Sequence, residues 1–329
     1  MKREPREKKA LFRAFFRIEI MNVDVIIPTY KPEKSFISLL SKLCEQTVKV
    51  NRVIIMNTDE ELFGFTDEDL HPFEGIISLH HIKKSEFDHG NTRHLAMEMS
   101  DADICVLMTM DAMPVDNMLL ERLIEPFANE KVAISYARQL AYESSSAAEK
   151  LIREFNYPDG DVVKSRIDVE KLGIKAYFCS NVCSAYRKSV YKELGGFIRK
   201  TIFNEDMIYA AKAVNSGYQI AYVSEARVYH SHDYTCMQQF RRNFDNGVSH
   251  AMNPDVFEGL SQDGEGMRMV KSVVKGLNKQ GKSLFVPAFI CKTGFRFVGF
   301  KLGCRYEKLP KKFVRWCSSS PNFFSFDTK

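Results

Sequence analysis

The sequence lacks the features that define several common classes of protein. Its eight cysteines include no C-x-x-C pair, so they indicate free thiols rather than a disulfide framework or a zinc site. It contains no internal repeat, no low-complexity tract and no recognised nucleic-acid-binding module. We therefore expect a soluble globular chain of ordinary composition that has no nucleic-acid partner.

Long apolar runs are also missing. Arg13 and Arg17 interrupt the aromatic residues near the N-terminus, a pattern that does not predict a signal peptide. No run reaches the length of roughly 20 residues that a membrane-spanning helix needs. Met21 stands just before the first predicted strand, so residues 1–21 are expected to be a basic extension outside the fold. Whether residues 1–20 are translated is left open.

Acidic residues are almost absent from the C-terminal part of the chain. Between Arg268 and Arg315 there are 13 Lys and Arg and one acidic residue, so this segment carries +12 and the rest of the chain −7. Bulky apolar residues alternate with these cations, as in Phe295-Arg-Phe-Val-Gly-Phe300. We expect a helical, basic region over residues 254–329 that faces an anionic membrane surface. Packing on the preceding domain and formation of a homodimer are the alternatives.

The first part of the chain alternates predicted strands with predicted helices, which favours an α/β fold with a mostly parallel sheet and helices on both faces. Residues 141–175 interrupt the alternation and are predicted to be rich in loops. Further strands are expected over Phe178–Tyr186, Tyr218–Val223 and Ala226–His230, and a helix from about Tyr234 to Asn253. The first strands are predicted over Val23–Ile27, Val53–Met56, Gly75–Leu79, Ile104–Met108 and Val132–Ser135.

A carboxylate follows the most continuous of these apolar runs. Ile104–Met108 has the pattern of a strand buried on both faces, and Asp111 comes three residues after it. Open α/β sheets bind ligands at the carboxyl ends of their strands, where a carboxylate can hold a divalent cation. The alternative is that Asp111 opens a turn or caps the helix that follows.

Several short motifs occur in an order that resembles the family 2 glycosyltransferases of the GT-A fold, and within them the bacterial rhamnosyltransferases. The resemblance covers residues 22–255 closely and the remainder loosely. It implies a catalytic domain over residues 22–253, with a nucleotide-binding half at 22–138 and an acceptor half at 139–253. The motifs are Ile26-Ile-Pro-Thr-Tyr30, Phe87-Asp-His-Gly-Asn-Thr-Arg93, Met108-Thr-Met-Asp-Ala-Met-Pro114, Gly195-Gly-Phe197, Asn204-Glu-Asp-Met207, His230-Ser-His-Asp-Tyr234 and Phe240-Arg-Arg-Asn-Phe244.

The resemblance implies an inverting transferase that uses a sugar nucleotide, most similar to users of dTDP-L-rhamnose, and a divalent metal, Mg²⁺ or Mn²⁺. The acceptor would be a lipid-linked glycan or a growing cell-surface polysaccharide, and the enzyme would work in the cytoplasm, peripherally on the inner face of the bacterial membrane. The alternatives are a UDP-hexose transferase, a catalytically idle sugar-nucleotide-binding module, and a metal hydrolase. The acceptor, its linkage position and the oligomeric state are left open.

The same resemblance assigns roles to residues. Asp206 is implied to be the catalytic base with Glu205 beside it; both open a predicted helix, whose dipole favours ionised carboxylates, and the alternative is that they only begin the helix. The family usually has Asp-x-Asp where this chain has Thr109-Met-Asp111, so the number of protein ligands to the metal is open. The implied donor-binding residues are Pro28, Thr29, Tyr30, Asp59, Asp88, His89, Arg93, Thr109 and Asp111.

His230 and His232 are two residues apart, so an extended chain places them on one face. They are candidate ligands that would add to Asp111, and imidazole ligands would shift the preference toward Mn²⁺. The alternative is a pair of hydrogen-bonded structural histidines. Ser180, Asn181 and Cys183 are expected to lie near the acceptor.

Overall fold

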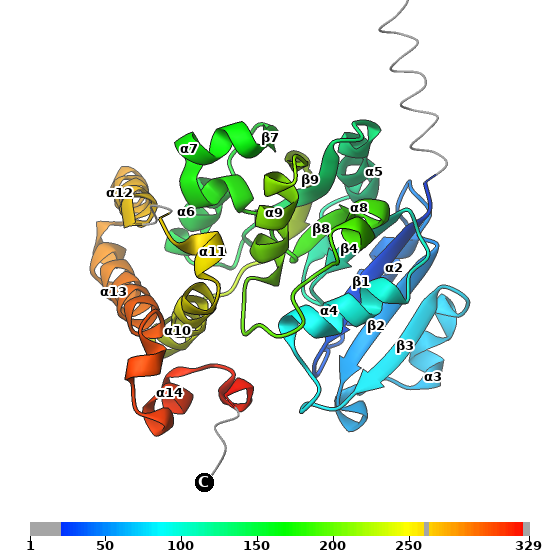
Figure 1. Ribbon diagram of the computed structural model, residues 1–329, viewed down its shortest axis with the longest axis horizontal. Helices are drawn as coiled ribbons and strands as arrows, with labels where there is room; N and C mark the ends of the chain where they lie inside the picture. The colour runs from blue at the N-terminus through cyan, green and yellow to red at the C-terminus, as the bar shows by residue number, and fades with distance from the viewer. Residues whose placement is uncertain (1–20, 260–262, 325–329) are drawn as a thin grey trace, which may run out of the picture.

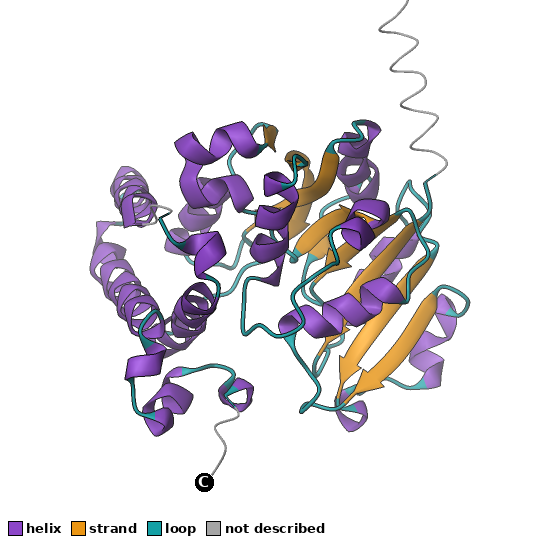
Figure 2. Ribbon diagram, in the orientation of Figure 1, coloured by secondary structure: helices purple, strands orange, loops and turns teal. Residues whose placement is uncertain are grey.

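A single mixed sheet forms the centre of the molecule in this computed structural model, which describes residues 21–259 and 263–324. The strand order is β3-β2-β1-β4-β8-β6-β9-β5, and β7 pairs with β9. Figure 2 shows the strands in orange and the helices around them in purple. The predicted α/β class is confirmed. The strands are β1 (Val23–Thr29), β2 (Arg52–Thr58), β3 (Ile77–Ile82), β4 (Ile104–Met108), β5 (Met113–Pro114), β6 (Val132–Leu140), β7 (Val162–Lys164), β8 (Cys183–Arg187) and β9 (Gln219–Tyr229).

Strands β1 to β4 form the parallel half of the sheet, and all five residues of β4 are buried, as its unbroken apolar run predicts. Helices α2 and α5 pack on one face and α4, α8 and α9 on the other. The helices of this domain are α2 (Ser35–Cys44), α3 (Asp67–Leu70), α4 (His89–Glu98), α5 (Leu119–Ile124), α6 (Ala147–Asn156), α7 (Val169–Leu172), α8 (Lys188–Glu193) and α9 (Glu205–Asn215).

The other half of the sheet is mixed. Strand β8 runs antiparallel between β4 and β6, whereas β6 and β9 are parallel. The two strands predicted over Tyr218–Val223 and Ala226–His230 are one strand, β9, and that prediction is wrong. A register shift opposite Ala137 and Arg138 of β6 takes up the intervening residues, so the break in the pattern marks a bulge rather than a turn.

The prediction that residues 141–175 are rich in loops is also wrong, because this segment contains α6, β7 and α7. The hydroxyl of Ser146 accepts a hydrogen bond from the N–H of Glu149 and caps α6. The apolar residues of α6, Leu151 among them, pack on Met269 and Val273 of α12. Because α12 lies far from α6 in the sequence, no local pattern predicts this packing.

The C-terminal region is helical and lies on the opposite side of the molecule from β3 (Figure 1). Two glycines of α13 rest against the main chain of α10: a Cβ added at Gly299 would lie 2.2 Å from the Phe240 carbonyl oxygen, and one at Gly303 would lie 2.1 Å from that of Phe244. Only glycine permits this approach. The helices here are α10 (Cys236–Met252), α11 (Pro254–Phe257), α12 (Asp263–Lys279), α13 (Val286–Gly303) and α14 (Lys311–Cys317).

One segment corrects the expectation that no stretch reaches the length of a membrane span. Residues Ser283–Gly303 form 21 helical residues with a mean hydropathy of 1.3 and are 11% buried, so they are long and apolar enough by length and composition. Lys292, Arg296 and Lys301 interrupt its apolar residues, so the sequence contains no unbroken apolar run of that length here. A single helix of this kind is weak evidence for a span, and its glycine face is already packed on α10.

Candidate active site

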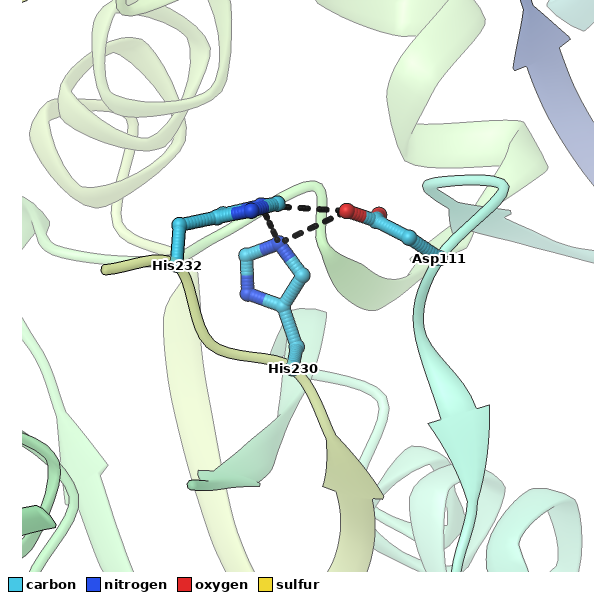
Figure 3. Close-up of side chains that lie close together, drawn as sticks. All are labelled: Asp111, His230 and His232. Carbon is cyan, nitrogen blue, oxygen red and sulfur yellow. Dashed lines mark hydrogen bonds and ion pairs between the residues drawn. The ribbon is translucent and has the colours of Figure 1, made fainter. Parts of the chain in front are cut away.

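Three of the residues singled out in the sequence converge where β4 and β9 end. Oδ2 of Asp111 lies 3.0 Å from Nε2 of His232 and 3.6 Å from Nε2 of His230. The two Nε2 atoms are 3.1 Å apart. Figure 3 shows the three side chains pointing toward one another from two separate segments. The structure thus brings together the carboxylate that follows β4 and the two histidines that follow β9.

A hydrogen bond at Nδ1 fixes the orientation of the His230 ring. Its Nδ1 lies 3.0 Å from Oε1 of Gln139, and the amide nitrogen of Gln139 donates to the hydroxyls of Tyr157 and Ser180. Oε1 of Gln139 also accepts from Arg153, so this oxygen is the acceptor and Nδ1 of His230 carries the proton. The lone pair of Nε2 therefore faces Asp111.

The electrostatics of this group suit a cation. Burial lowers the pKa of His230 to about 3, which keeps the imidazole neutral near pH 7. Burial acts to raise the pKa of Asp111, but the hydrogen bond from His232 and the proximity of His230 hold it below its ordinary value. The ligand atoms of all three residues lie within 4.8 Å of one another. Two imidazole nitrogens and a carboxylate oxygen form a donor set that fits Mn²⁺ or another divalent transition metal.

A second group lies at the start of α9, where Asn181 contacts both acidic residues. Its main-chain N–H donates to Oδ2 of Asp206 over 3.1 Å, and its side-chain amide donates to Oε1 of Glu205 over 3.0 Å. The amide oxygen of Asn181 accepts from the hydroxyls of Ser184 and Tyr186. The direction of the amide is therefore fixed, and with it the positions of both carboxylates.

The two carboxyl groups have opposite electrostatic environments. Burial and the negative charge of Glu205 raise the pKa of Asp206 to about 7. Burial also acts to raise the pKa of Glu205, but Arg93, whose Nε lies 3.3 Å from Oε1 of Glu205, reverses this and holds the pKa below its ordinary value. Adjacent carboxyl groups with divergent pKa values are typical of acid–base sites.

Backbone conformation at Asn204 turns the chain into α9. This residue has φ 64°, a left-handed conformation that asparagine tolerates better than most residues. Its side-chain amide donates to Oδ1 of Asn246 and to the hydroxyl of Ser249 on α10. The first turn of α9, which carries both carboxylates, is thereby tied to α10.

The two groups are linked through consecutive residues. The hydroxyl of Ser180 accepts from Gln139, which orients His230. The next residue, Asn181, holds Asp206 and Glu205. One short segment before β8 therefore contacts both the residue that orients His230 and the acidic pair.

A third group follows β1 and β2. The hydroxyl of Thr29 donates to Oδ1 of Asn57 over 3.0 Å. Asp59, at φ 60°, accepts the main-chain N–H of Lys84. The ammonium group of Lys84 lies over the ring of Tyr30, which is 38% exposed. An exposed aromatic ring beside a cation and a carboxylate forms a surface suited to a nucleobase and its ribose. Pro28 lies in β1, opposite Met56 of β2.

The remaining predicted donor contacts lie at the start of α4. Asp88 caps this helix by accepting from the N–H groups of Gly90 and Asn91, and it also accepts from Thr201. This local role alone accounts for its position. His89 packs edge-on against Phe87, and burial lowers its pKa to about 4. Arg93 is buried against Glu205.

Sequence reasoning missed the residues that orient this site. Gln139 and Arg153 support His230, while Asn57 and Lys84 support the surface beside Tyr30. None belongs to a quoted motif, and each acts through a partner from another strand or helix. The sequence predicts Asn181 near the acceptor but does not predict its contacts with both carboxylates.

Sequence comparisons relate this chain to one family of known proteins. Residues 24–195 match the model of the family described as glycosyl transferase family 2. The O-antigen chain rhamnosyltransferase RfbN of Salmonella typhimurium is 36% identical over 311 residues, covering 93% of this chain and 96% of the relative. The O-antigen chain rhamnosyltransferase WbaN of Salmonella anatum is 40% identical over 248 residues, covering 74% of this chain and 78% of the relative.

Two solved structures share the fold at low sequence identity. The mannosyltransferase PcManGT of Pyrobaculum calidifontis, in complex with GDP-Man and Mn²⁺, has a TM-score of 0.57 at 13% identity and covers 92% of this chain and 96% of its own. The S. aureus protein TarS, residues 1–349 in complex with UDP-GlcNAc, has a TM-score of 0.53 at 15% identity and covers 91% and 84%. These likenesses extend to the C-terminal helical region.

Proposed function

Since the chain belongs to glycosyltransferase family 2 and is a glycosyltransferase, we propose that it transfers L-rhamnose from dTDP-L-rhamnose. The acceptor is a lipid-linked or growing cell-surface glycan of the O-antigen kind. Two relatives of 36% and 40% identity that are O-antigen chain rhamnosyltransferases support this donor and acceptor. The observation that carries the chemistry is the convergence of Asp111, His230 and His232 beside an acidic pair held by Asn181.

Asp111, His230 and His232 would hold the divalent cation, Mn²⁺ or Mg²⁺. Two imidazole ligands favour Mn²⁺, and the mannosyltransferase of similar fold holds this ion with its sugar nucleotide. When bound, the cation neutralises charge on the departing nucleoside diphosphate. Thr109 stands where the family usually has a further aspartate, and the histidines replace the ligand that it would supply.

Asp206 is the catalytic base. It accepts the proton of an acceptor hydroxyl while that oxygen forms its bond to the anomeric carbon and the bond from that carbon to the diphosphate breaks. Attack from the side opposite the leaving group inverts the configuration. A raised pKa matches the base to neutral pH. Glu205, paired with Arg93, keeps a negative charge beside it.

The donor lies along the carboxyl ends of β1 and β2. Pro28, Thr29, Tyr30 and Asp59 contact the nucleoside there, and Lys84 holds Asp59 in place. Asp88, His89 and Arg93 form the wall between this surface and the acidic pair, and Thr109 lies beside Asp111. We propose that residues 22–138 form the nucleotide-binding half and residues 139–253 the acceptor half, with residues 254–329 as the basic extension.

The C-terminal helices bring the enzyme to the inner face of the cell membrane. Leu284, Phe297 and Val298 are 93%, 56% and 50% exposed, and Trp316 of α14 is 50% exposed. Apolar side chains that project among lysines and arginines suit an anionic bilayer surface. The packing of α13 on α10 through its glycine face supports peripheral attachment rather than a membrane-spanning role for this helix.

Calorimetry with dTDP-L-rhamnose, UDP-glucose and UDP-galactose, each with and without Mn²⁺ or Mg²⁺, tests the donor and the metal. We expect the dTDP sugar to bind only in the presence of metal. Preference for a UDP sugar would keep the chemistry and overturn the donor, and a lack of binding by all three would favour an idle module. Hydrolysis of the donor at one rate with or without acceptor would indicate a hydrolase.

A further inference from the structure

A cavity of about 300 Å³ lies between α6 and α13, beside the candidate metal ligands. His232 lines it on one side, so the cavity adjoins the group formed by Asp111, His230 and His232. Nothing in the proposed donor site uses this space. We call it the α6–α13 cavity; its other walls come from Ile152 of α6, from Tyr234, and from the residues around Phe289 of α13.

Three cationic side chains contribute to the lining of the cavity. Lys282, Lys292 and Arg296 line it, and in the described part of the chain none of the three is paired with a carboxylate at ion-pair distance. The lining also contains two acidic residues, and their charges act on two of these cations, Asp233 on Lys292 and Glu149 on Arg296. Glu149 forms an ion pair of 2.8 Å with Arg153, and Asp233 accepts hydrogen bonds from Ser146. The lining thus has three cations against two carboxylates, one of which is paired with Arg153 outside the lining, so its net charge is positive.

Most of the lining is apolar, and it reaches the surface of the molecule. Ile152, Ala288 and Phe289 line the cavity, and Phe285 lines it while remaining 59% exposed. Leu284, next to Phe285, is 93% exposed. Apolar wall and exposed apolar surface are thus continuous at the start of α13. A ligand that fits has a compact anionic group joined to a hydrocarbon chain.

We propose that the α6–α13 cavity binds the phosphate or diphosphate end of a lipid-linked acceptor. Lys282, Lys292 and Arg296 bind the phosphate oxygens by charge-assisted hydrogen bonds. The first carbon units of the lipid lie along Ile152 and Phe289 and leave past Phe285 toward the membrane. The glycan on the other side of the phosphate then extends past His232 to the reacting centre. This inference rests on the proposed function, because it identifies how that acceptor is held.

Calorimetry of the full-length protein with farnesyl diphosphate tests the site, with EDTA present so that metal-mediated binding of diphosphate is removed. Farnesol and inorganic diphosphate are the two half-ligands. We expect farnesyl diphosphate to bind at least about tenfold more tightly than either, since only it contacts both walls. Equal affinity for farnesyl diphosphate and inorganic diphosphate would contradict the apolar wall.

Three variants locate the binding. Lys282→Ala and Arg296→Met each remove one cationic partner and should weaken farnesyl diphosphate binding by about tenfold. Ala288→Trp fills the cavity without changing charge and should abolish binding. Lys279→Ala is the matched control, because Lys279 is an exposed lysine at the end of α12 that does not line the cavity. Its affinity should equal that of the unmodified protein.

Binding of dTDP-L-rhamnose with Mn²⁺, measured on the same four variants, separates this inference from the proposed function. We expect donor affinity to stay unchanged in all of them. Donor binding without any farnesyl diphosphate binding would overturn the cavity and leave the transferase proposal intact. Farnesyl diphosphate binding that Ala288→Trp leaves unaffected would place the lipid elsewhere and also overturn it. If the unmodified protein does not bind dTDP-L-rhamnose at all, the proposed function itself is rejected.

Discussion

The main-chain N–H of Asn181 donates a hydrogen bond of 3.1 Å to Oδ2 of Asp206, while the side chain of Asn181 holds the neighbouring Glu205. Asp206 therefore keeps its place without a cation of its own, and its proton affinity is set by burial and by Glu205.

Replacement Asp206→Asn should reduce kcat by about 10³-fold, because a general base contributes about 10²- to 10⁴-fold. The amide oxygen can still accept the hydrogen bond of Asn181, so the fold and donor affinity should be retained. Radiolabelled transfer assays and calorimetry measure the two quantities. The control is Asp255→Asn, a surface carboxylate of α11. If Asp206→Asn transfers the sugar at the rate of the unmodified protein, Asp206 is not the catalytic base.

The rate of transfer should rise with pH through about 7, the raised pKa of Asp206, because only the ionised carboxylate accepts a proton. Glu205→Gln removes the adjacent negative charge and should move this rise to lower pH. Profiles of kcat/KM against pH measure both. A profile that does not shift in Glu205→Gln would mean that another group titrates.

The same shift predicts a change in stability. Between the ordinary value of 3.8 and about 7, the folded protein holds a proton at Asp206 that the unfolded chain has released. Asp206 therefore makes the free energy of unfolding fall as pH rises through this window. Urea unfolding at several pH values should show a smaller fall in Asp206→Asn. An identical slope in both proteins would contradict the raised pKa.

Replacement Gln139→Leu should weaken Mn²⁺ binding by about 10- to 100-fold, although Gln139 is not a proposed ligand. It removes the acceptor of the Nδ1 proton of His230, and the ring then loses its fixed tautomer. Manganese titration followed by electron paramagnetic resonance gives the affinity. Gln280→Leu, at an exposed glutamine after α12, serves as the control. Unchanged affinity in Gln139→Leu would argue against His230 as a ligand.

Replacement Gly303→Ala should lower the free energy of unfolding by about 1–3 kcal/mol, the usual cost of overpacking. The new methyl group would meet the main-chain carbonyl of Phe244 at 2.1 Å. Gly294→Ala on the same helix meets nothing within 4 Å and should instead stabilise by about 1 kcal/mol. Thermal unfolding of the two variants tests this. A Tm that moves in the same direction in both would mean that α13 does not pack tightly on α10.

The parallel half of the sheet could be predicted from the sequence, because strands buried on both faces appear as continuous apolar runs, such as that of β4. The placement of Asp111 could also be predicted, since residues that follow the strands of such a sheet lie at its carboxyl edge, where ligands bind. The role of Gln139 and the presence of α6 could not be predicted, because their partners are remote in the sequence. Gln139, for example, contacts a histidine 91 residues away. The family resemblance supplied the role of Asp206, which local pattern alone describes only as a helix start.

The left-handed backbone at Asn204 has a consequence for how this enzyme can diverge. Most side chains would raise the energy of that conformation by about 1–2 kcal/mol, and glycine, which adopts it freely, would forfeit the hydrogen bonds to Asn246 and Ser249. Natural variation should therefore be narrow at position 204, with asparagine dominant. Where another residue does appear there, we expect compensating substitutions at positions 246 and 249 within the same lineage.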